Sequence, residues 1–188
     1  MADVLPGLDA TGAWDIPARL NMAAQVCDSL AEAEPARVAI IDLTGGARRD
    51  VSFGTLSDMV DGLARALAQR VQAGDRVGVL LGQSPWCAAA HLAIWKIGAI
   101  SVPLFKLFKY DALASRVRDA GVTLVLTDPE GRDLLGGLAT PLMADSVGVA
   151  GDPVAFADTG PDDPAVLIYT SGTTGSPKGA LHGHRVLT

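Results

Sequence analysis

Several residue types are scarce in this sequence, and each shortage argues against a class of protein. The 188 residues include two cysteines, Cys27 and Cys87, which have no metal-binding or redox spacing. Two isolated cysteines favour buried free thiols in a reducing cytoplasm over a disulfide. Lysine and arginine together number 15 against 21 acidic residues, which gives a formal net charge of −6. This balance argues against nucleic acid as a partner, because binding to its phosphates needs a basic patch.

Long apolar runs are also missing. No stretch approaches the roughly 20 apolar residues that a membrane helix requires, so we expect no membrane span. Residues 1–15 hold three aspartates and neither lysine nor arginine, which argues against a secretory signal. Apolar residues still make up 49% of the chain, which is typical of a globular protein with a sizeable core. We therefore expect a cytoplasmic globular protein.

Apolar periodicity predicts an alternation of strands and helices after a leading arm over residues 1–18. The predicted strands share short runs of apolar, often β-branched residues. They cover 38–41, 51–53, 76–81, 100–102, 122–126, 141–143 and 165–169. The predicted helices share an apolar residue at every third or fourth position and begin or end at capping residues. They run from Asn21 to Pro35, Thr55 to Gly74, Ser84 to Gly98, Asp111 to Gly121, and over 133–138.

The order of these elements predicts the fold. The first two strands form a hairpin, and the later strand–helix–strand units need right-handed crossovers, which give a parallel sheet. We expect an α/β fold with a mostly parallel sheet, flanking helices and an early β-hairpin, as a partial domain over 19–188.

Side-chain environments follow from the same pattern. The helix from Thr55 should bury an apolar stripe and turn three charged residues toward water. The stripe is Leu56, Met59, Val60, Leu63, Leu67 and Val71, and the charged residues are Asp61, Arg65 and Arg70. We expect Lys106 and Lys109 on a solvated loop, and a turn at 128–131.

The most informative stretch is a loop that follows the last predicted strand. The strand runs into residues with hydroxyl groups or no side chain, from Thr170 to Gly175, and Pro177 and Lys178 follow. Glycine lets the backbone approach an anion closely, N–H groups and hydroxyls donate hydrogen bonds to phosphate oxygens, and lysine adds positive charge. The pattern predicts a phosphate-binding loop, with a plain surface turn of the same composition as the alternative.

The Walker pattern does not fit this loop, because Gly172 should then be followed five positions later by Gly-Lys and Ser or Thr. Pro177 stands at that position, and Gly179 follows Lys178. A P-loop nucleotidase is therefore disfavoured. Residues 167–179 instead resemble the AMP-binding signature of the adenylate-forming superfamily, which comprises acyl-CoA synthetases, luciferases and adenylation domains of peptide synthetases. The resemblance extends over roughly residues 20–188, and residues 103–108 are most similar to acyl-CoA synthetases for short or medium-chain acids.

The resemblance implies an acid–thiol ligase. A small carboxylic acid would attack the α-phosphate of MgATP to give an acyl-adenylate and pyrophosphate, and coenzyme A would then take the acyl group. The implied cofactors are ATP, Mg²⁺ and coenzyme A. The loop would bind the β- and γ-phosphates and the departing pyrophosphate, with Lys178 also acting in catalysis. The implied loop residues are Thr170, Ser171, Gly172, Thr173, Thr174, Gly175 and Lys178.

The resemblance covers only part of such an enzyme, because the adenine pocket, the ribose-binding aspartate and the lid lysine come later in the family. We expect an amino-terminal fragment that is inactive alone and forms a homodimer over 165–188, where a sheet edge would be bare. A non-catalytic nucleotide-binding or interaction module with the same fold is the alternative. The resemblance also implies a helix over 180–188. His182 and His184 would then not share a face, so we expect no metal there.

Overall fold

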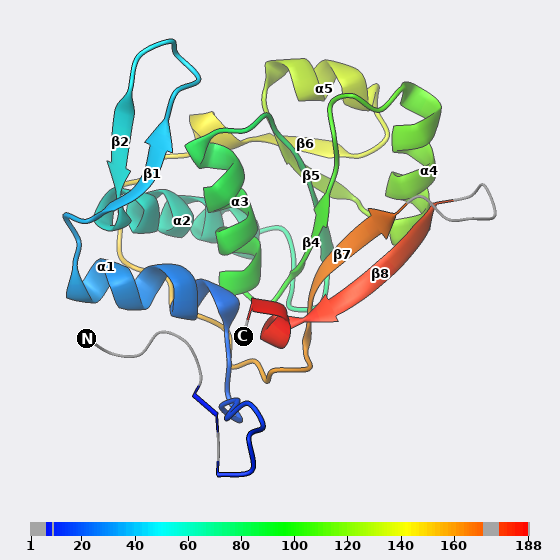
Figure 1. Cartoon of the computed structure of the whole chain (residues 1–188). Helices are drawn as coiled ribbons and strands as arrows, with labels where there is room; N and C mark the ends of the chain where they lie inside the picture. The colour runs from blue at the N-terminus through cyan, green and yellow to red at the C-terminus, as the bar shows by residue number, and fades with distance from the viewer. Residues whose placement is uncertain (1–6, 9, 171–176, 188) are drawn as a thin grey trace.

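A six-stranded sheet lies at the centre of the computed structural model, which describes residues 7, 8, 10–170 and 177–187 (Figure 1). The strands are β3 (Arg76–Leu80), β4 (Ile100–Pro103), β5 (Leu124–Thr127), β6 (Thr140–Met143), β7 (Pro164–Thr170) and β8 (Lys178–Gly183). Their order is β6-β5-β3-β4-β7-β8, and every pair is parallel except β7 with β8. The predicted α/β fold with a mostly parallel sheet is confirmed.

The remaining elements flank this sheet or precede it. They are η1 (Ala24–Asp28), α1 (Ser29–Ala33), α2 (Phe53–Ala68), α3 (Pro85–Lys96), α4 (Tyr110–Ala120), α5 (Pro129–Leu135), η2 (Ala144–Ser146) and η3 (His184–Leu187). An antiparallel hairpin of β1 (Val38–Asp42) and β2 (Arg49–Ser52) comes before α2, as predicted. In Figure 1 the hairpin extends away from the sheet, above α2.

The sheet separates two apolar cores, because successive side chains of a strand point to opposite faces. Val77 and Val79 of β3 pack in the first core with α2 and α3, whereas Leu80 packs in the second core with α4 and α5. In β5, Val125 likewise turns away from the core that holds its neighbours Leu124 and Leu126. Helices on both faces are what a parallel sheet needs to hide its apolar strands.

The start and end of α2 differ from the prediction. The helix begins at Phe53 rather than Thr55, because the Ser52 hydroxyl accepts a hydrogen bond from the Thr55 N–H at 3.2 Å and so caps it earlier. Phe53 therefore belongs to the helix and not to the preceding strand. The helix ends at Ala68, and Gly74 instead takes a positive φ of 85° in the turn before β3.

The stretch 128–131, predicted as a turn, is the start of α5. The Asp128 carboxylate accepts a hydrogen bond from the Gly131 N–H at 2.9 Å, and Pro129 occupies the first helical position. The helix predicted over 133–138 thus begins at Pro129 and ends at Leu135. A cap followed by proline is a helix signal, and it outweighed the turn propensity of the same residues.

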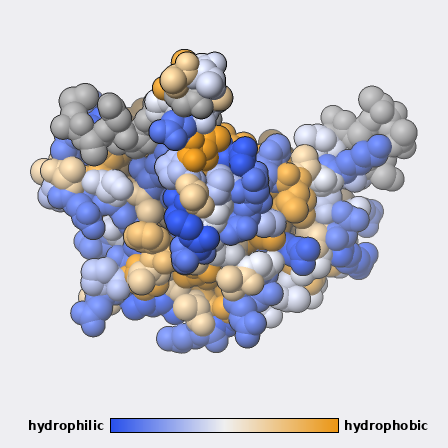
Figure 2. Space-filling view, turned by 90° about the horizontal axis from the view of Figure 1, so that it is seen from below, coloured by the Kyte–Doolittle hydropathy of each residue, from blue (hydrophilic) through white to orange (hydrophobic). Residues whose placement is uncertain are grey.

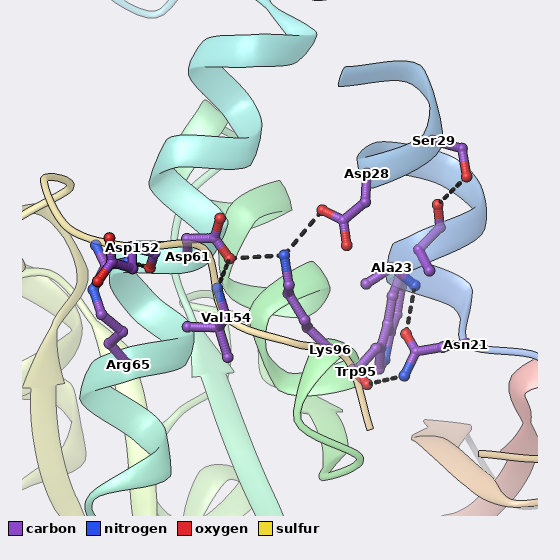
Figure 3. Close-up of polar contacts among 11 residues, drawn as sticks. Asn21, Ala23, Asp28, Ser29, Asp61, Arg65, Trp95, Lys96, Asp152 and Val154 are labelled. Atoms are coloured by element: carbon purple, nitrogen blue, oxygen red, sulfur yellow. Dashed lines mark hydrogen bonds and ion pairs between the residues drawn. The ribbon is translucent and has the colours of Figure 1, made fainter. Parts of the chain in front are cut away.

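A buried ionic cluster joins three helices in the first core (Figure 3). The ammonium of Lys96, a residue 3% exposed, lies 3.0 Å from Asp28 Oδ1 and 2.7 Å from Asp61 Oδ1. Burial alone would lower the pKa of Lys96, but the two carboxylates raise it above its usual value. The prediction that Asp61 faces water is wrong, because this carboxylate pairs with a lysine from α3 and accepts the Val154 N–H at 3.0 Å.

Acidification is expected to destabilise the fold through His91 of α3. Burial lowers the pKa of this imidazole to about 4, so the unfolded chain binds its proton more readily than the folded one. The contribution of His91 to the free energy of unfolding is complete above pH 6.5. It decreases by about 3 kcal/mol as the pH falls toward 4. His184, whose pKa burial also lowers, contributes in the same direction.

Urea unfolding of the wild type and of His91→Gln between pH 4 and 8 tests this expectation. The variant should show a flatter dependence on pH, and His182→Gln, at a partly exposed position, is the control. Parallel pH curves for the wild type and His91→Gln would contradict it.

The surface is mainly polar on the face seen from below, where apolar residues form small separate patches (Figure 2). In the described part of the chain, no helix is long and apolar enough to cross a membrane. Cys27 is buried and Cys87 partly buried, and both are free thiols, as predicted.

Candidate functional site

The two ends of the predicted phosphate loop lie opposite each other on neighbouring strands. β7 ends at Thr170, β8 begins at Lys178, and these two residues are cross-strand partners in an antiparallel pair. β7 also pairs in parallel with β4, so Thr170 lies at the edge where the parallel strands end. Ligands of open α/β sheets bind at this carboxyl edge. The strand–loop junction is therefore in a position where a ligand can bind.

The structure places two of the seven predicted loop residues. Thr170 and Lys178 are both exposed, so their side chains are accessible to a solute. Ser171, Gly172, Thr173, Thr174 and Gly175 lie outside the described residues. The phosphate-binding roles of all seven remain predictions.

Tyr169, just before the loop, is held by helix α4. Its hydroxyl donates a hydrogen bond to the Asp119 carboxylate, and the Arg116 guanidinium lies 6.0 Å from its ring centre. The same guanidinium lies 4.1 Å from the ring centre of Phe108. Burial and the Asp119 carboxylate raise the pKa of Tyr169, so this phenol stays a neutral donor. These contacts fix the end of β7 against the second core.

Gly179, directly after Lys178, allows β8 to lie close against β7. A methyl group at this position would come within 2.9 Å of Leu167 Cδ1 and 3.4 Å of the Tyr169 ring. A side chain here would push these cross-strand neighbours apart and shift the start of β8. The glycine after the lysine thus has a packing reason that the sequence pattern alone did not give.

The helix implied over 180–188 is wrong. Residues up to Gly183 form β8 against β7, and only His184–Leu187 turn into a short 3₁₀ helix. β8 also pairs with the edge of β7 that was expected to be bare. Within β7, only Ala165 and Val166 are buried. Cross-strand pairing with β7, which a local pattern does not reveal, decides the conformation. Among the described residues no group of three His, Cys, Asp or Glu is arranged to hold a metal ion.

A second polar group at the carboxyl edge escaped the sequence analysis. Lys106, expected on a solvated loop after β4, lies with its ammonium 2.6 Å from Asp128 and 2.7 Å from Glu130, which follow β5. Burial alone would lower the pKa of Lys106, but the two carboxylates raise it. The sequence signal that could have predicted this group is the position of its members, because all three residues come shortly after the ends of parallel strands of one sheet.

Comparison with protein families matches residues 27–188 to the family described as AMP-binding enzyme. The chain belongs to this family. An acetyl-coenzyme A synthetase from Shewanella oneidensis is 32% identical over 210 residues, in an alignment that covers 90% of this chain and 32% of the relative. The chain thus spans about a third of the length of that relative.

Solved structures share the fold. The crystal structure of an acyl-CoA synthetase from Brucella canis superposes with a TM-score of 0.79 at 25% identity, covering 98% of this chain and 36% of that one. MatB from Rhodopseudomonas palustris, solved with ATP bound, superposes with a TM-score of 0.74 at 28% identity, covering 87% of this chain and 35% of its own. The superpositions agree with the resemblance that the sequence carries.

Proposed function

We propose that this chain is the phosphate-binding part of an ATP-dependent carboxylic acid–CoA ligase. The observation that supports it most is the antiparallel pairing of Thr170 with Lys178 at the carboxyl edge of the sheet, within a chain of the AMP-binding enzyme family. Relatives named acetyl-CoA synthetase and acyl-CoA synthetase favour a carboxylic acid and coenzyme A as the other substrates. The acid remains a class: a small carboxylate.

In the proposed reaction a carboxylate oxygen attacks the α-phosphorus of ATP, the bond to the bridging oxygen breaks, and pyrophosphate leaves. Both reactants are anions, so stabilising the negative charge should dominate catalysis. Lys178 supplies one positive charge at the end of the loop, and the Thr170 hydroxyl can donate a hydrogen bond to a phosphate oxygen. The thiol of coenzyme A then attacks the acyl carbon, and AMP leaves.

The donor set fits a polyphosphate better than a metal ion. Lys178 is a cation and cannot ligate Mg²⁺, whereas hydroxyls and backbone N–H groups are donors to phosphate oxygens. When bound with ATP, Mg²⁺ neutralises charge on the phosphates. The part that we assign to this chain is to bind the phosphates between Thr170 and Lys178 and to stabilise the departing pyrophosphate.

Carboxylate-dependent ATP–pyrophosphate exchange tests the proposal. The complete protein that contains this chain should exchange labelled pyrophosphate into ATP only when a suitable carboxylic acid is present. A panel of acids from acetate to medium-chain fatty acids would identify the substrate class. Binding of ATP without exchange for any acid would favour the non-catalytic module, and exchange that needs no acid would contradict the ligase.

A further inference from the structure

Strand β8 carries Lys178 but buries almost nothing that would fix its register against β7. Lys178, Gly179, Ala180 and Leu181 are exposed, and His182 and Gly183 are only partly buried. A slip of one residue would turn every side chain of the strand to the other face. Where one face is buried, the apolar pattern prevents such a slip, but β8 has no buried face. Apart from the close approach of Gly179 to Leu167, its register therefore depends on contacts beyond the strand.

His184, the residue directly after β8, is fully buried, with 0% exposure. Its Nδ1 accepts a hydrogen bond from the main-chain N–H of Met22 at 3.1 Å, across 162 positions of sequence. Met22 begins the continuous helical stretch over 22–33 that contains η1 and α1. N–H groups at such a helix start have no helical partner, and the Asn21 side chain accepts the N–H of Ala23. Figure 1 shows η3 beside this helix start.

The segment before β7 fixes the path of the chain at the same place. The His184 N–H donates to the Asp163 carbonyl at 3.2 Å, and the Arg185 N–H to that of Pro161 at 2.9 Å. A methyl group on Gly183 would meet the Pro161 carbonyl oxygen at 2.6 Å. The end of β8 is therefore enclosed between the first helix and 161–163, and His184 joins the two.

We propose that His184 is a positioning residue that sets the register of β8 and so places Lys178 opposite Thr170, an inference that rests on the proposed function for its catalytic consequence. It acts through the hydrogen bond to Met22 and does not touch the reacting atoms. The bond requires a neutral imidazole, because a protonated Nδ1 cannot accept. Burial lowers the pKa of His184, although the charge of Asp163 acts to raise it. Positive charge is also unfavourable beside a helix start, so the imidazole stays neutral. Two arginines close in sequence to His184 or Met22 are paired with carboxylates, Arg185 with Asp162 and Arg19 with Asp158.

Two isosteric substitutions separate this role from bulk packing. Asparagine can place its oxygen where Nδ1 lies, and glutamine places its polar end where Nε2 lies. His184→Asn should therefore keep the acceptor for Met22, and His184→Gln should lose it. In pyrophosphate exchange by the complete protein, we expect kcat to fall about 10- to 100-fold for His184→Gln and to stay within about threefold for His184→Asn, since a catalytic group displaced by about 1 Å can cost 10²-fold. His182→Ala is the control on the same strand.

A second measurement does not depend on catalysis. In NMR of this chain, cross-strand contacts should show Tyr169 opposite Gly179 in the wild type and in His184→Asn, with a slowly exchanging Met22 amide. His184→Gln should lose both signatures while circular dichroism remains that of a folded protein. If the register persists in His184→Gln, or if Asn and Gln behave alike, the inference is overturned. If neither the wild type nor any variant exchanges pyrophosphate into ATP, but the register shifts as expected in His184→Gln, the proposed function fails. The anchoring role of His184 then stands.

Discussion

Replacing Lys178 with alanine is expected to slow carboxylate-dependent ATP–pyrophosphate exchange by about 10²- to 10³-fold, or about 3–4 kcal/mol of transition-state stabilisation. The side chain is exposed at the start of β8, so its loss should leave the fold intact. A charged donor that meets the departing pyrophosphate is needed more in the transition state than in the ground state. The loss should therefore appear in kcat more than in KM for ATP.

Lys109→Ala is the matched control, because Lys109 is also an exposed lysine but does not belong to the loop. Its exchange rate should stay near that of the wild type. Wild-type exchange in Lys178→Ala would remove this lysine from the mechanism. An equal loss in both variants would point to the net charge of the surface instead.

Replacing Lys96 with methionine should destabilise the fold by about 3–5 kcal/mol, because two carboxylates would remain buried side by side without their cation. Asp61 is 7% exposed, and Asp28 already has one buried oxygen, Oδ2, with no hydrogen-bond partner in the described structure. Burial raises the pKa of Asp28 and Lys96 lowers it, with a net rise, so losing the lysine favours protonation of this carboxyl. The free energy of unfolding in urea, measured at pH 7, reports the effect.

Arg48→Met is the control for this stability prediction, since Arg48 pairs with Asp50 at the surface, where side-chain exposures are 62% and 40%. An exposed pair contributes about 0–1 kcal/mol. A triple variant with Lys96→Met, Asp28→Asn and Asp61→Asn should recover part of the loss, because it removes the charges together. If Lys96→Met costs no more than Arg48→Met, the buried cluster does not stabilise the fold.

Sequence patterns predicted an element correctly where the contacts that determine it lie within a few residues. The apolar runs of β3 and β5 predicted strands because both faces of a parallel sheet are buried. Ser84 followed by Pro85 predicted the start of α3, and the Ser84 hydroxyl accepts the Cys87 N–H at 3.3 Å. Gly121 predicted the end of α4, where it takes a positive φ of 65°. In each case the deciding contact lies within a few residues of the signal.

Two of the errors arose where the deciding partner lies outside the local sequence pattern. Asp61 was expected in water because its partner Lys96 is on another helix. Residues 178–183 form a strand because β7 offers an edge, a fact of topology rather than of local propensity. The loop composition predicted phosphate chemistry, but it gave neither the pairing of Thr170 with Lys178 nor the anchor at His184.

Transfer of an oxygen label tests the central claim most directly. The complete protein would be incubated with ATP, coenzyme A and a carboxylic acid labelled with ¹⁸O in both oxygens, and the AMP analysed by mass spectrometry. If the carboxylate attacks the α-phosphorus and the thiol then displaces AMP from the acyl carbon, each AMP carries one ¹⁸O and the thioester keeps the other. Unlabelled AMP, or ADP as the product with label in inorganic phosphate, would contradict an adenylate-forming ligase.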